Sequence, residues 1–272
     1  MSPSREGLGR TALITGASAG IGAALARVFA AHGFNLVLTA RRAERLSALA
    51  DELRASHGVD ARVMPADLAR PETCGILVTS LEEEGVTVDA LVNNAGYGVP
   101  GLYRHTPWEA QRDFIQVLVT APCELTHRLL PGMTRRGYGR ILNIASVAGL
   151  MPGSASHTLY GGAKAMLIKF SQSLHSEHKG TGVFVSALCP GFTYSEFHDV
   201  NGTRGVMSRL PKFMWLSAER VAEEGYRAVM RNDVLCIPGA QYKLISTLAR
   251  LLPMDSVHRL GEMRSRLASR RR

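Results

Sequence analysis

Apolar residues along this chain fall into short continuous runs that alternate with longer stretches of helical spacing. The run at 11–15 precedes a glycine-rich turn, and Gly33 ends the helix expected after that turn. Within this helix the apolar positions recur every three or four residues, at Ile21, Ala24, Leu25 and Val28. A second strand at 35–39 and a charged helix through about Ser56 repeat the arrangement.

The same alternation continues through most of the remaining chain. Further strands are predicted at 61–65, 88–93, 140–145, 182–188 and 234–237, and further helices at about 71–84, 107–130, 160–179 and 217–231. Continuous apolar strands between helices are typical of a parallel sheet that is covered on both faces. The sequence therefore predicts an α/β fold with a doubly wound, mostly parallel sheet of about seven strands. We expect residues 1–272 to form a single domain, with its core at about 10–240.

The net charge of +9 comes mostly from the end of the chain. Residues 241–272 carry eight Lys or Arg against Asp255 and Glu262, which leaves about +3 for everything before them. Basic and aromatic residues do not interleave as they do in base-stacking surfaces. We therefore do not expect a nucleic-acid partner.

Cysteine spacing and the first residues indicate a reducing compartment. The four cysteines are far apart and form no CxxC pair, which argues against disulfides and a zinc site. The polar start lacks the apolar core of a signal peptide, and no stretch approaches 18 uninterrupted apolar residues. We expect a cytoplasmic protein without a metal ion.

The turn after the first strand places three glycines in a GxxxGxG pattern. Gly16 can form the tight turn, Gly20 can let backbone amides approach a pyrophosphate, and Gly22 can let the helix pack closely on the sheet. A phosphate would then lie at the helix N-terminus. An ordinary βα turn would also use glycines, so this motif alone does not decide the ligand.

Several motifs in the same order resemble the short-chain dehydrogenase/reductase family, over roughly residues 10–240. They are TGxxxGIG at 15–22, Asp67-Leu68, Asn93-Asn94-Ala95-Gly96, Ser146, Tyr160-Gly-Gly-Ala-Lys164 and Pro190-Gly191. The resemblance implies a Rossmann-type domain that binds a nicotinamide cofactor. The cofactor-binding residues that it implies are Gly16, Ser18, Ala19, Gly20, Ile21, Gly22, Asp67, Leu68, Asn93, Ala95, Gly96, Tyr160, Lys164, Pro190, Gly191 and Thr193.

Charge after the second strand favours NADP(H) over NAD(H). An NAD enzyme of this type needs a carboxylate there for the ribose 2′-hydroxyl, but the chain has Ala40 followed by Arg41 and Arg42. A guanidinium can bind a 2′-phosphate through paired hydrogen bonds. Arg41 is the first choice for this contact and Arg42 the second, although both could be solvated residues at a helix start.

Tyr160 and Lys164 lie four residues apart in a predicted helix and would share one face. A free tyrosine has a pKa of about 10. A nearby ammonium and an oxidised nicotinamide both favour phenolate, so we expect Tyr160 to act as an acid and base. The resemblance adds that Lys164 would bind the nicotinamide ribose. Ser146, at the end of the strand at 140–145, can hold the substrate oxygen.

One position departs from the family pattern. The family usually has an asparagine in the helix after NNAG, where its amide supports a water chain to the lysine; this chain has Leu118. Gln116, two positions away, would face elsewhere on a helix. Proton relay could be slower, another group could hold the water, or the change could inactivate the protein.

The last part of the chain contains an expected lid and a basic tail. By resemblance, residues 192–216 form the lid over substrate and nicotinamide, where Thr193 or Ser195 could bind the carboxamide. Its apolar residues suit an apolar substrate or a small core of the lid itself. The tail at 241–272 combines leucines with arginines, so it could make weak contact with an anionic membrane, contact another subunit or pack on the body as an amphipathic helix. The resemblance also suggests a homo-oligomer.

Together these residues predict an NADP(H)-dependent oxidoreductase, a ketoreductase or alcohol dehydrogenase. It would transfer a hydride between the nicotinamide and the carbonyl or secondary alcohol of an apolar small molecule. Two alternatives stay open: a cofactor-binding or regulatory protein with weakened catalysis, which Leu118 would favour, and non-redox catalysis on the same fold. The complete set of Ser146, Tyr160 and Lys164 argues against lost catalysis.

Overall fold

The computed structural model describes residues 6–153, 158–194 and 211–251. Most of the expected lid, including Ser195, and the tail beyond residue 251 lie outside these residues. Of the helices in the described ranges, none is both long and apolar enough to cross a bilayer.

Seven parallel strands form one sheet, as the sequence predicts. They are β1 (Thr11–Thr15), β2 (Asn35–Thr39), β3 (Ala61–Val63), β4 (Ala90–Asn93), β5 (Gly139–Ile144), β6 (Val183–Leu188) and β7 (Leu235–Cys236). Their order in the sheet is β3-β2-β1-β4-β5-β6-β7, and every neighbouring pair is parallel. The central strands are buried throughout, which explains why they read as continuous apolar runs.

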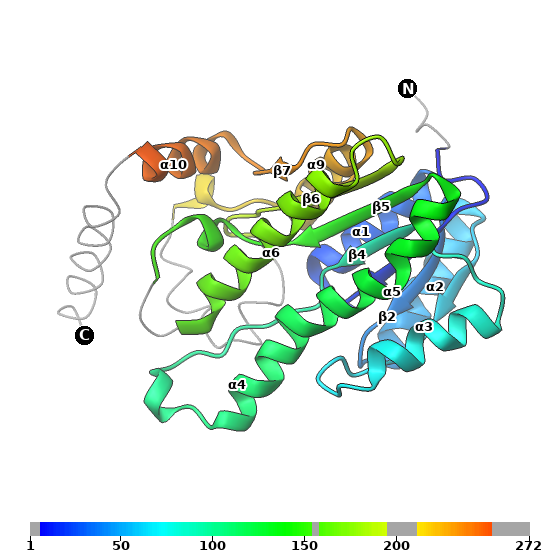
Figure 1. The fold of residues 1–272 in the computed structure, drawn as a ribbon, viewed down its shortest axis with the longest axis horizontal. Helices are drawn as coiled ribbons and strands as arrows, with labels where there is room; N and C mark the ends of the chain where they lie inside the picture. Colours follow the sequence, from blue (N-terminus) through cyan, green and yellow to red (C-terminus); the bar gives the residue numbers. More distant parts are fainter. Residues whose placement is uncertain (1–5, 154–157, 195–210, 252–272) are drawn as a thin grey trace.

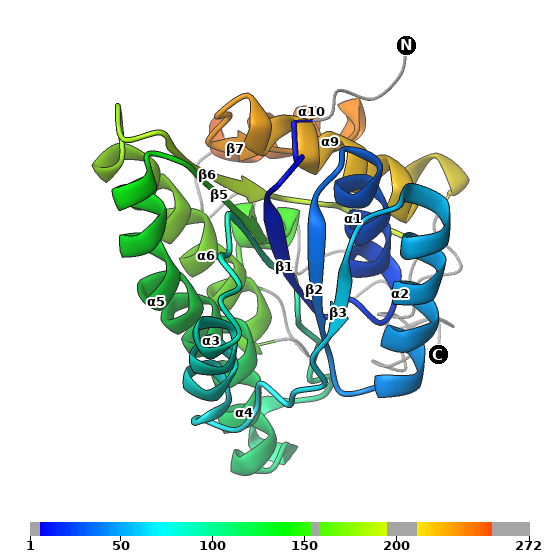
Figure 2. The same cartoon turned by 90° about the vertical axis from the view of Figure 1, so that its right-hand side faces the viewer.

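Helices cover both faces of this sheet (Figures 1 and 2). One face carries α1 (Gly20–Ala31), α2 (Ala43–His57) and α9 (Ala218–Met230); the other carries α3 (Thr73–Glu83), α4 (Trp108–Ile115), α5 (Ala121–Arg136) and α6 (Thr158–Glu177). A further helix, α10 (Ala240–Leu251), follows β7. The layers are those of a doubly wound Rossmann fold.

Each face has its own apolar core. Phe29 of α1 and Val221 of α9 are fully buried on one face, and Phe114 and Leu125 are buried on the other. Burying one side chain of this size stabilises a fold by roughly 1.5–3 kcal/mol. The two cores hold the helices against the sheet and so fix the loops at the strand ends.

The helix predicted at about 107–130 is interrupted in the structure. A π-helical turn, Gln116–Thr120, separates α4 from α5, and α5 continues past Pro131 to Arg136. A π turn inserts one extra residue into the helical ladder and rotates the side chains on either side of it. Leu118 lies in this turn, so its direction does not follow from regular helical spacing.

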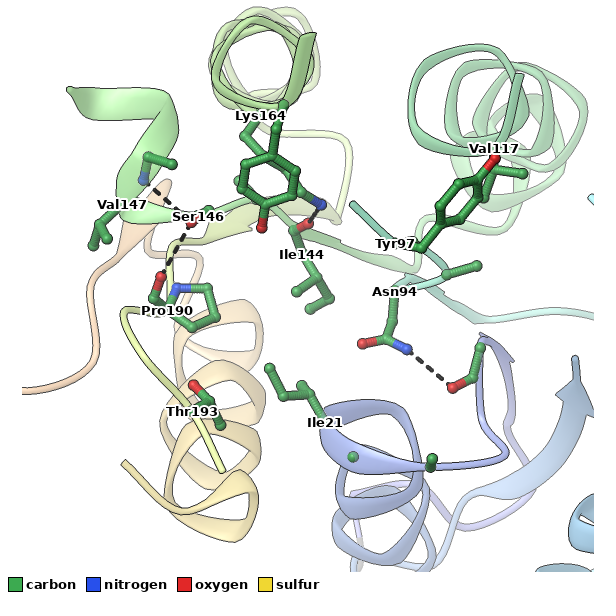
Figure 3. Close-up of a pocket in the computed structure, with 18 of the residues that line it drawn as sticks. Ile21, Asn94, Tyr97, Val117, Ile144, Ser146, Val147, Lys164, Pro190 and Thr193 are labelled. Carbon is green, nitrogen blue, oxygen red and sulfur yellow. Dashed lines mark hydrogen bonds between the residues drawn. The ribbon is translucent and has the colours of Figure 1, made fainter. Parts of the chain in front are cut away.

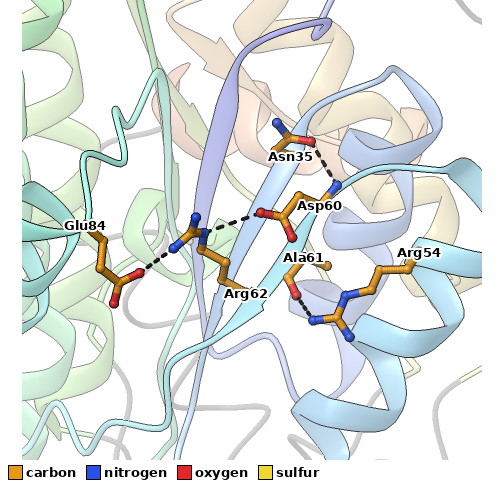
Figure 4. A network of polar contacts seen from close by, with 6 residues as sticks. All are labelled: Asn35, Arg54, Asp60, Ala61, Arg62 and Glu84. Atoms are coloured by element: carbon orange, nitrogen blue, oxygen red, sulfur yellow. Dashed lines mark hydrogen bonds and ion pairs between the residues drawn. The ribbon is translucent and has the colours of Figure 1, made fainter.

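Edge strand β3 is held by polar contacts with its neighbours (Figure 4). The Arg62 guanidinium lies between the carboxylates of Asp60, at 3.4 Å, and Glu84. The backbone amide of Asp60 donates to Asn35 Oδ1 at 2.9 Å. Exposed ion pairs contribute little stability, but charges on an edge strand oppose pairing with another sheet.

The strand order also sets the position of the functional site. Winding reverses between β1 and β4, which are neighbours in the sheet although two strands separate them in the sequence. In open parallel sheets, ligands bind beyond the carboxyl ends of the strands at such a switch point.

Candidate active site

A cavity of about 840 Å³ lies at this switch point and collects the loops that follow six of the strands. It brings together most of the residues predicted from the sequence. These are Gly16, Ser18, Ala19, Gly20, Ile21, Arg41, Arg42, Asp67, Leu68, Ala95, Gly96, Ser146, Tyr160, Lys164, Pro190, Gly191 and Thr193. Gly22 and Asn93 are outside its lining.

The glycine turn has a backbone that side chains would disrupt. Gly16 and Gly20 have φ of +66° and +56°, in the left-handed region that favours glycine. A Cβ on Gly22 would lie 2.3 Å from the Gly16 carbonyl oxygen, so Gly22 permits close packing without lining the cavity. Helix α1 starts here, and its N-cap residue is Ala19, whose methyl group cannot accept hydrogen bonds from the first turn. Such a helix end suits a phosphate.

Hydrogen bonds tie this turn to the end of β4. Thr15 Oγ1 accepts from the backbone amides of Asn94, at 2.9 Å, and Ala95, at 3.0 Å. Asn94 Nδ2 in turn donates to the carbonyl oxygens of Thr15, at 2.9 Å, and Gly16, at 3.2 Å, and Figure 3 draws one of these bonds. Asn94 thus holds the two loops at the switch point together. Asn94 belongs to the NNAG motif, but the motif alone does not reveal this role.

The first asparagine of that motif has a different environment. Asn93 is buried, and its Nδ2 donates to Asn143 Oδ1 at 2.8 Å. Asn143 Nδ2 donates to Ser171 Oγ at 2.9 Å, and Ser171 donates to the Leu167 carbonyl oxygen at 2.7 Å. These side chains form a buried polar ladder from β4 through β5 to α6. The side chain of Asn93 therefore belongs to the core between sheet and helix.

Arginines border the cavity after β2. Arg41 and Arg42 are exposed, and Arg42 Nη2 donates to Ser18 Oγ in the glycine turn at 3.0 Å. Asp67, which follows β3, also lines the cavity and accepts from the Ala69 amide at 3.2 Å. Positive charge therefore lies next to the turn that suits a phosphate.

Ser146, Tyr160 and Lys164 meet at the opposite side of the cavity. Ser146 follows β5; its hydroxyl accepts from the Ala148 amide at 3.1 Å and donates to the Pro190 carbonyl oxygen at 3.4 Å (Figure 3). Lys164 is buried, with its Nζ 5.8 Å from the centre of the Tyr160 ring. One turn of α6 and the end of β5 thus supply all three groups.

Burial has the largest effect on the pKa values of Tyr160 and Lys164. Burial raises the pKa of Tyr160 to about 12, while a hydrogen bond with Ser146 acts in the opposite direction. Burial lowers the pKa of Lys164 to about 8, although the charge of Cys189 acts in the opposite direction. Desolvation of the phenolate is therefore the largest influence on the phenol pKa, and the expected lowering by the ammonium together with an oxidised nicotinamide stays a prediction.

Comparison with known proteins now identifies the family. The short chain dehydrogenase profile matches residues 10–203. The chain belongs to the short-chain dehydrogenase family. A ketoacyl reductase, HetN, from Nostoc is 35% identical over 90% of this chain and 83% of its own length.

Solved short-chain dehydrogenases share the fold and contain both forms of the cofactor. A Sphingobium yanoikuyae enzyme in complex with NADPH has a TM-score of 0.79 and 32% identity, covering 89% of this chain and 93% of its own. A Burkholderia phymatum protein in complex with NAD has the same TM-score and coverage with 25% identity. The family thus establishes that the chain is an oxidoreductase with a nicotinamide cofactor. Because one of these structures contains NADPH and the other NAD, the comparison does not distinguish NADP(H) from NAD(H).

Leu118 is apolar, whereas the short-chain dehydrogenase pattern has a polar asparagine at this position. Its side chain is 1% exposed, and a Cβ on Gly96 would lie 3.5 Å from Leu118 Cγ. Within the described part of the chain, Gln116 Nε2 is buried and has no hydrogen-bond partner. Neither Leu118 nor Gln116 is part of the cavity lining, which Val117 between them reaches.

The remaining lining is mostly apolar, and Met214 in it belongs to the lid expected at 192–216. These residues come from loops and helices on the substrate side: Tyr97, Val117, Met151, Pro152, Met214, Tyr242 and Ile245. Asp113 and Ser246 add polar groups. Tyr97 immediately follows the NNAG motif, which could have pointed to it. Apart from Met214, the others are set by packing that local sequence does not reveal.

Tyr242 of α10 holds both ends of the segment expected to be the lid. Its hydroxyl accepts from the Phe192 amide at 2.9 Å and donates to the Met214 carbonyl oxygen. Backbone hydrogen bonds also join these two ends. The Leu216 amide donates to the Phe192 carbonyl oxygen, and the Tyr194 amide donates to the Leu216 carbonyl oxygen, both at 2.9 Å. The two ends of the segment are therefore fixed to the body and to each other.

Proposed function

We propose that this short-chain dehydrogenase is an NADP(H)-dependent reductase of ketones or aldehydes, or the reverse dehydrogenase, for an apolar small molecule. One observation carries the proposal: Ser146, Tyr160 and Lys164 line the same cavity as the uncapped N-terminus of α1. A dinucleotide is long enough to connect such a phosphate site with the catalytic groups.

The lining fits this cofactor. The first turn of α1 would hold the pyrophosphate, Asp67 and Leu68 would contact the adenine, and Lys164 would hold the nicotinamide ribose. Thr193 is buried at the lining and would face the carboxamide. When bound, the nicotinamide supplies or accepts the hydride, while the protein positions and polarises the substrate.

The protein's part of the reduction is to hold and release a proton. With its pKa raised to about 12, Tyr160 is protonated at neutral pH and can donate its proton to the carbonyl oxygen. The Ser146 hydroxyl would donate a hydrogen bond to the same oxygen and stabilise its developing negative charge. In the oxidation direction the same groups would act in reverse, with the Tyr160 phenolate accepting the proton of the alcohol.

Residues after β2 support NADP(H) as the cofactor. Ala40 stands where a carboxylate would repel a 2′-phosphate, and Arg41 and Arg42 border the cavity. Because Ser18 already orients Arg42, Arg41 remains the first choice for paired hydrogen bonds to the phosphate.

An NADPH-oxidation screen over ketones and aldehydes tests this function. We expect turnover with apolar carbonyl compounds, and a fall of at least about a hundredfold for Tyr160→Phe, given typical contributions of general acids. The Tyr160→Phe variant should still bind NADPH, which the fluorescence of the cofactor measures. The control is Tyr103→Phe, whose side chain is exposed and outside the cavity lining. Full turnover by Tyr160→Phe would exclude the proposed acid.

Leu118 supports a second candidate, a cofactor-binding protein with weak catalysis. A buried leucine cannot hold a water chain between Lys164 and solvent. Such a protein would bind NADPH without turnover of any carbonyl compound in the screen, and Tyr160→Phe would then change nothing measurable.

A further inference from the structure

Helix α10 buries one face against the body and has apolar residues on the opposite face. Tyr242 and Ser246 are buried against the body. Leu244, Leu248 and Leu251, spaced by four and three residues, form a stripe on the other side with exposed fractions of 61%, 50% and 77%. Packing against the body therefore explains one face of α10 and leaves the leucine stripe facing outward.

Aromatic and basic residues extend this surface. Phe213 is 69% exposed, and its carbonyl oxygen accepts from Gln241 Nε2 at 3.1 Å, which places it beside the start of α10. Lys212 and Lys243 are exposed next to these apolar residues in the sequence. We call the exposed set of Lys212, Phe213, Lys243, Leu244, Leu248 and Leu251 the α10 surface.

The α10 surface borders the cavity. Ile245 and Ser246, from the same helix, and Met214, next to Phe213, all line the cavity. Figure 1 shows α10 at the end of the molecule toward which the strands point, where the cavity lies. A partner that covers the leucine stripe would therefore lie next to the substrate end of the site.

Charge indicates the chemistry of that partner. Residues 241–272 carry a net charge of +6, two thirds of the total of the chain. Apolar helix faces with adjacent Lys and Arg are typical of segments that bind anionic lipid surfaces. A second copy of this chain would bring its own Lys212 and Lys243 to the interface, and three leucines are far short of the roughly 800 Å² per partner that stable dimers bury.

We propose that the α10 surface docks on an anionic lipid bilayer. The leucine stripe and Phe213 would enter the boundary between headgroups and acyl chains, and the basic residues would contact lipid phosphates. This binding is independent of catalysis, so it holds whether or not the oxidoreductase function is correct. It would place the mouth of an apolar cavity against the bilayer, from which apolar substrates could enter.

Vesicle co-sedimentation of the full chain tests the proposal. We expect binding to vesicles of phosphatidylcholine with phosphatidylglycerol, much weaker binding to phosphatidylcholine alone, and weakening by salt. Leu244→Glu with Leu248→Glu should lower the partition coefficient at least about tenfold, because two large apolar side chains no longer enter the bilayer. The matched control is Ile76→Glu on α3, which is equally exposed as Leu244 but far from α10.

Tryptophan quenching provides a measurement that does not depend on the glutamate variants. Brominated lipids should quench Trp215, which stacks on Tyr194 beside the α10 surface, in a Trp108→Phe variant. They should leave Trp108 on α4 bright in a Trp215→Phe variant, because α4 and α10 lie on opposite sides of the molecule (Figure 1). Equal quenching of Trp108 and Trp215 would overturn the proposed orientation of the protein on the bilayer.

Three other results would overturn the proposal. They are no binding to the anionic vesicles, undiminished binding by the double glutamate variant, and a dimer in light scattering that this variant converts to a monomer. The last result would assign the leucine stripe to a second copy.

Discussion

Lys164 donates a hydrogen bond from its Nζ to the carbonyl oxygen of Ile144, at 2.7 Å, and so joins helix α6 to the end of β5. Ser146 follows that carbonyl by two residues, so this bond also fixes the spacing of the catalytic set. The lysine is held by the body of the protein, in a position from which its remaining N–H groups can bind a ribose.

Lys164 should titrate near pH 8 rather than at its ordinary pKa of 10.5, because burial disfavours the ammonium. The ¹³Cε resonance of Lys164, assigned by its loss in Lys164→Met, measures this directly. A titration midpoint above 10 would show that the Ile144 carbonyl compensates for burial fully.

The same shift makes a stability prediction. Between pH 8 and 10.5 the unfolded chain holds the Lys164 proton more tightly than the folded chain, so unfolding takes up protons. The free energy of unfolding of the wild type should therefore rise relative to that of Lys164→Met across this window. Denaturant unfolding at pH 7, 9 and 10.5 checks the sign, and a constant difference between the two proteins would contradict it.

Leu118→Asn should raise turnover several-fold if a missing water chain limits proton relay. The buried amide should also lower the free energy of unfolding by about 1–3 kcal/mol unless water satisfies it. Steady-state kinetics and denaturant unfolding separate the two effects. Leu118→Ala is the control, because it opens space beside Gly96 without adding an amide. Equal kinetics in the two variants would show that room, not hydrogen bonding, matters here.

Arg41→Ala should weaken NADPH binding by about ten- to a hundredfold and leave NADH binding unchanged. The reason is that a charge-assisted hydrogen bond contributes about 1.5–3 kcal/mol. Titration calorimetry with both cofactors measures the difference. Arg45→Ala removes the same charge from α2 at an exposed position outside the cavity lining, so it should bind both cofactors normally. If both variants lose NADPH affinity alike, general charge rather than a specific phosphate contact is responsible.

Tyr242→Phe should lower the free energy of unfolding by about 1–3 kcal/mol, because it leaves the Phe192 amide and the Met214 carbonyl without their buried partner. KM should rise more than kcat falls, since the hydrogen bonds of Tyr242 lie at the substrate end of the cavity. Urea unfolding and steady-state kinetics measure both. Unchanged stability would mean that water replaces the hydroxyl.

Much of the architecture could be predicted from the sequence because its signals are local. The buried strands read as apolar runs, and the positive φ of Gly16 and Gly20 needs glycine. The loops that these elements position then bring the motif residues together, which is why the cavity contains nearly all of them.

Other features depend on contacts between distant segments. The π turn at Gln116–Thr120 follows from the packing of α4 and α5, which helical periodicity does not encode. The raised pKa of Tyr160 depends on how deeply the whole cavity buries it, whereas spacing alone suggested only its neighbour Lys164. Asn93 shows the same limit, since the motif does not reveal that its side chain bonds Asn143 in another strand.

The ladder from Asn93 through Asn143 to Ser171 has a consequence for how the site could be altered. These amide and hydroxyl groups can pair in only one register. A shift of α6 along the sheet would therefore leave several buried polar groups without hydrogen-bond partners. The ladder thereby fixes α6, which carries Tyr160 and Lys164, to β5 and β4. Side chains such as Met151 or Ile245 could then be exchanged to admit different carbonyl compounds while the proton donor stays in place.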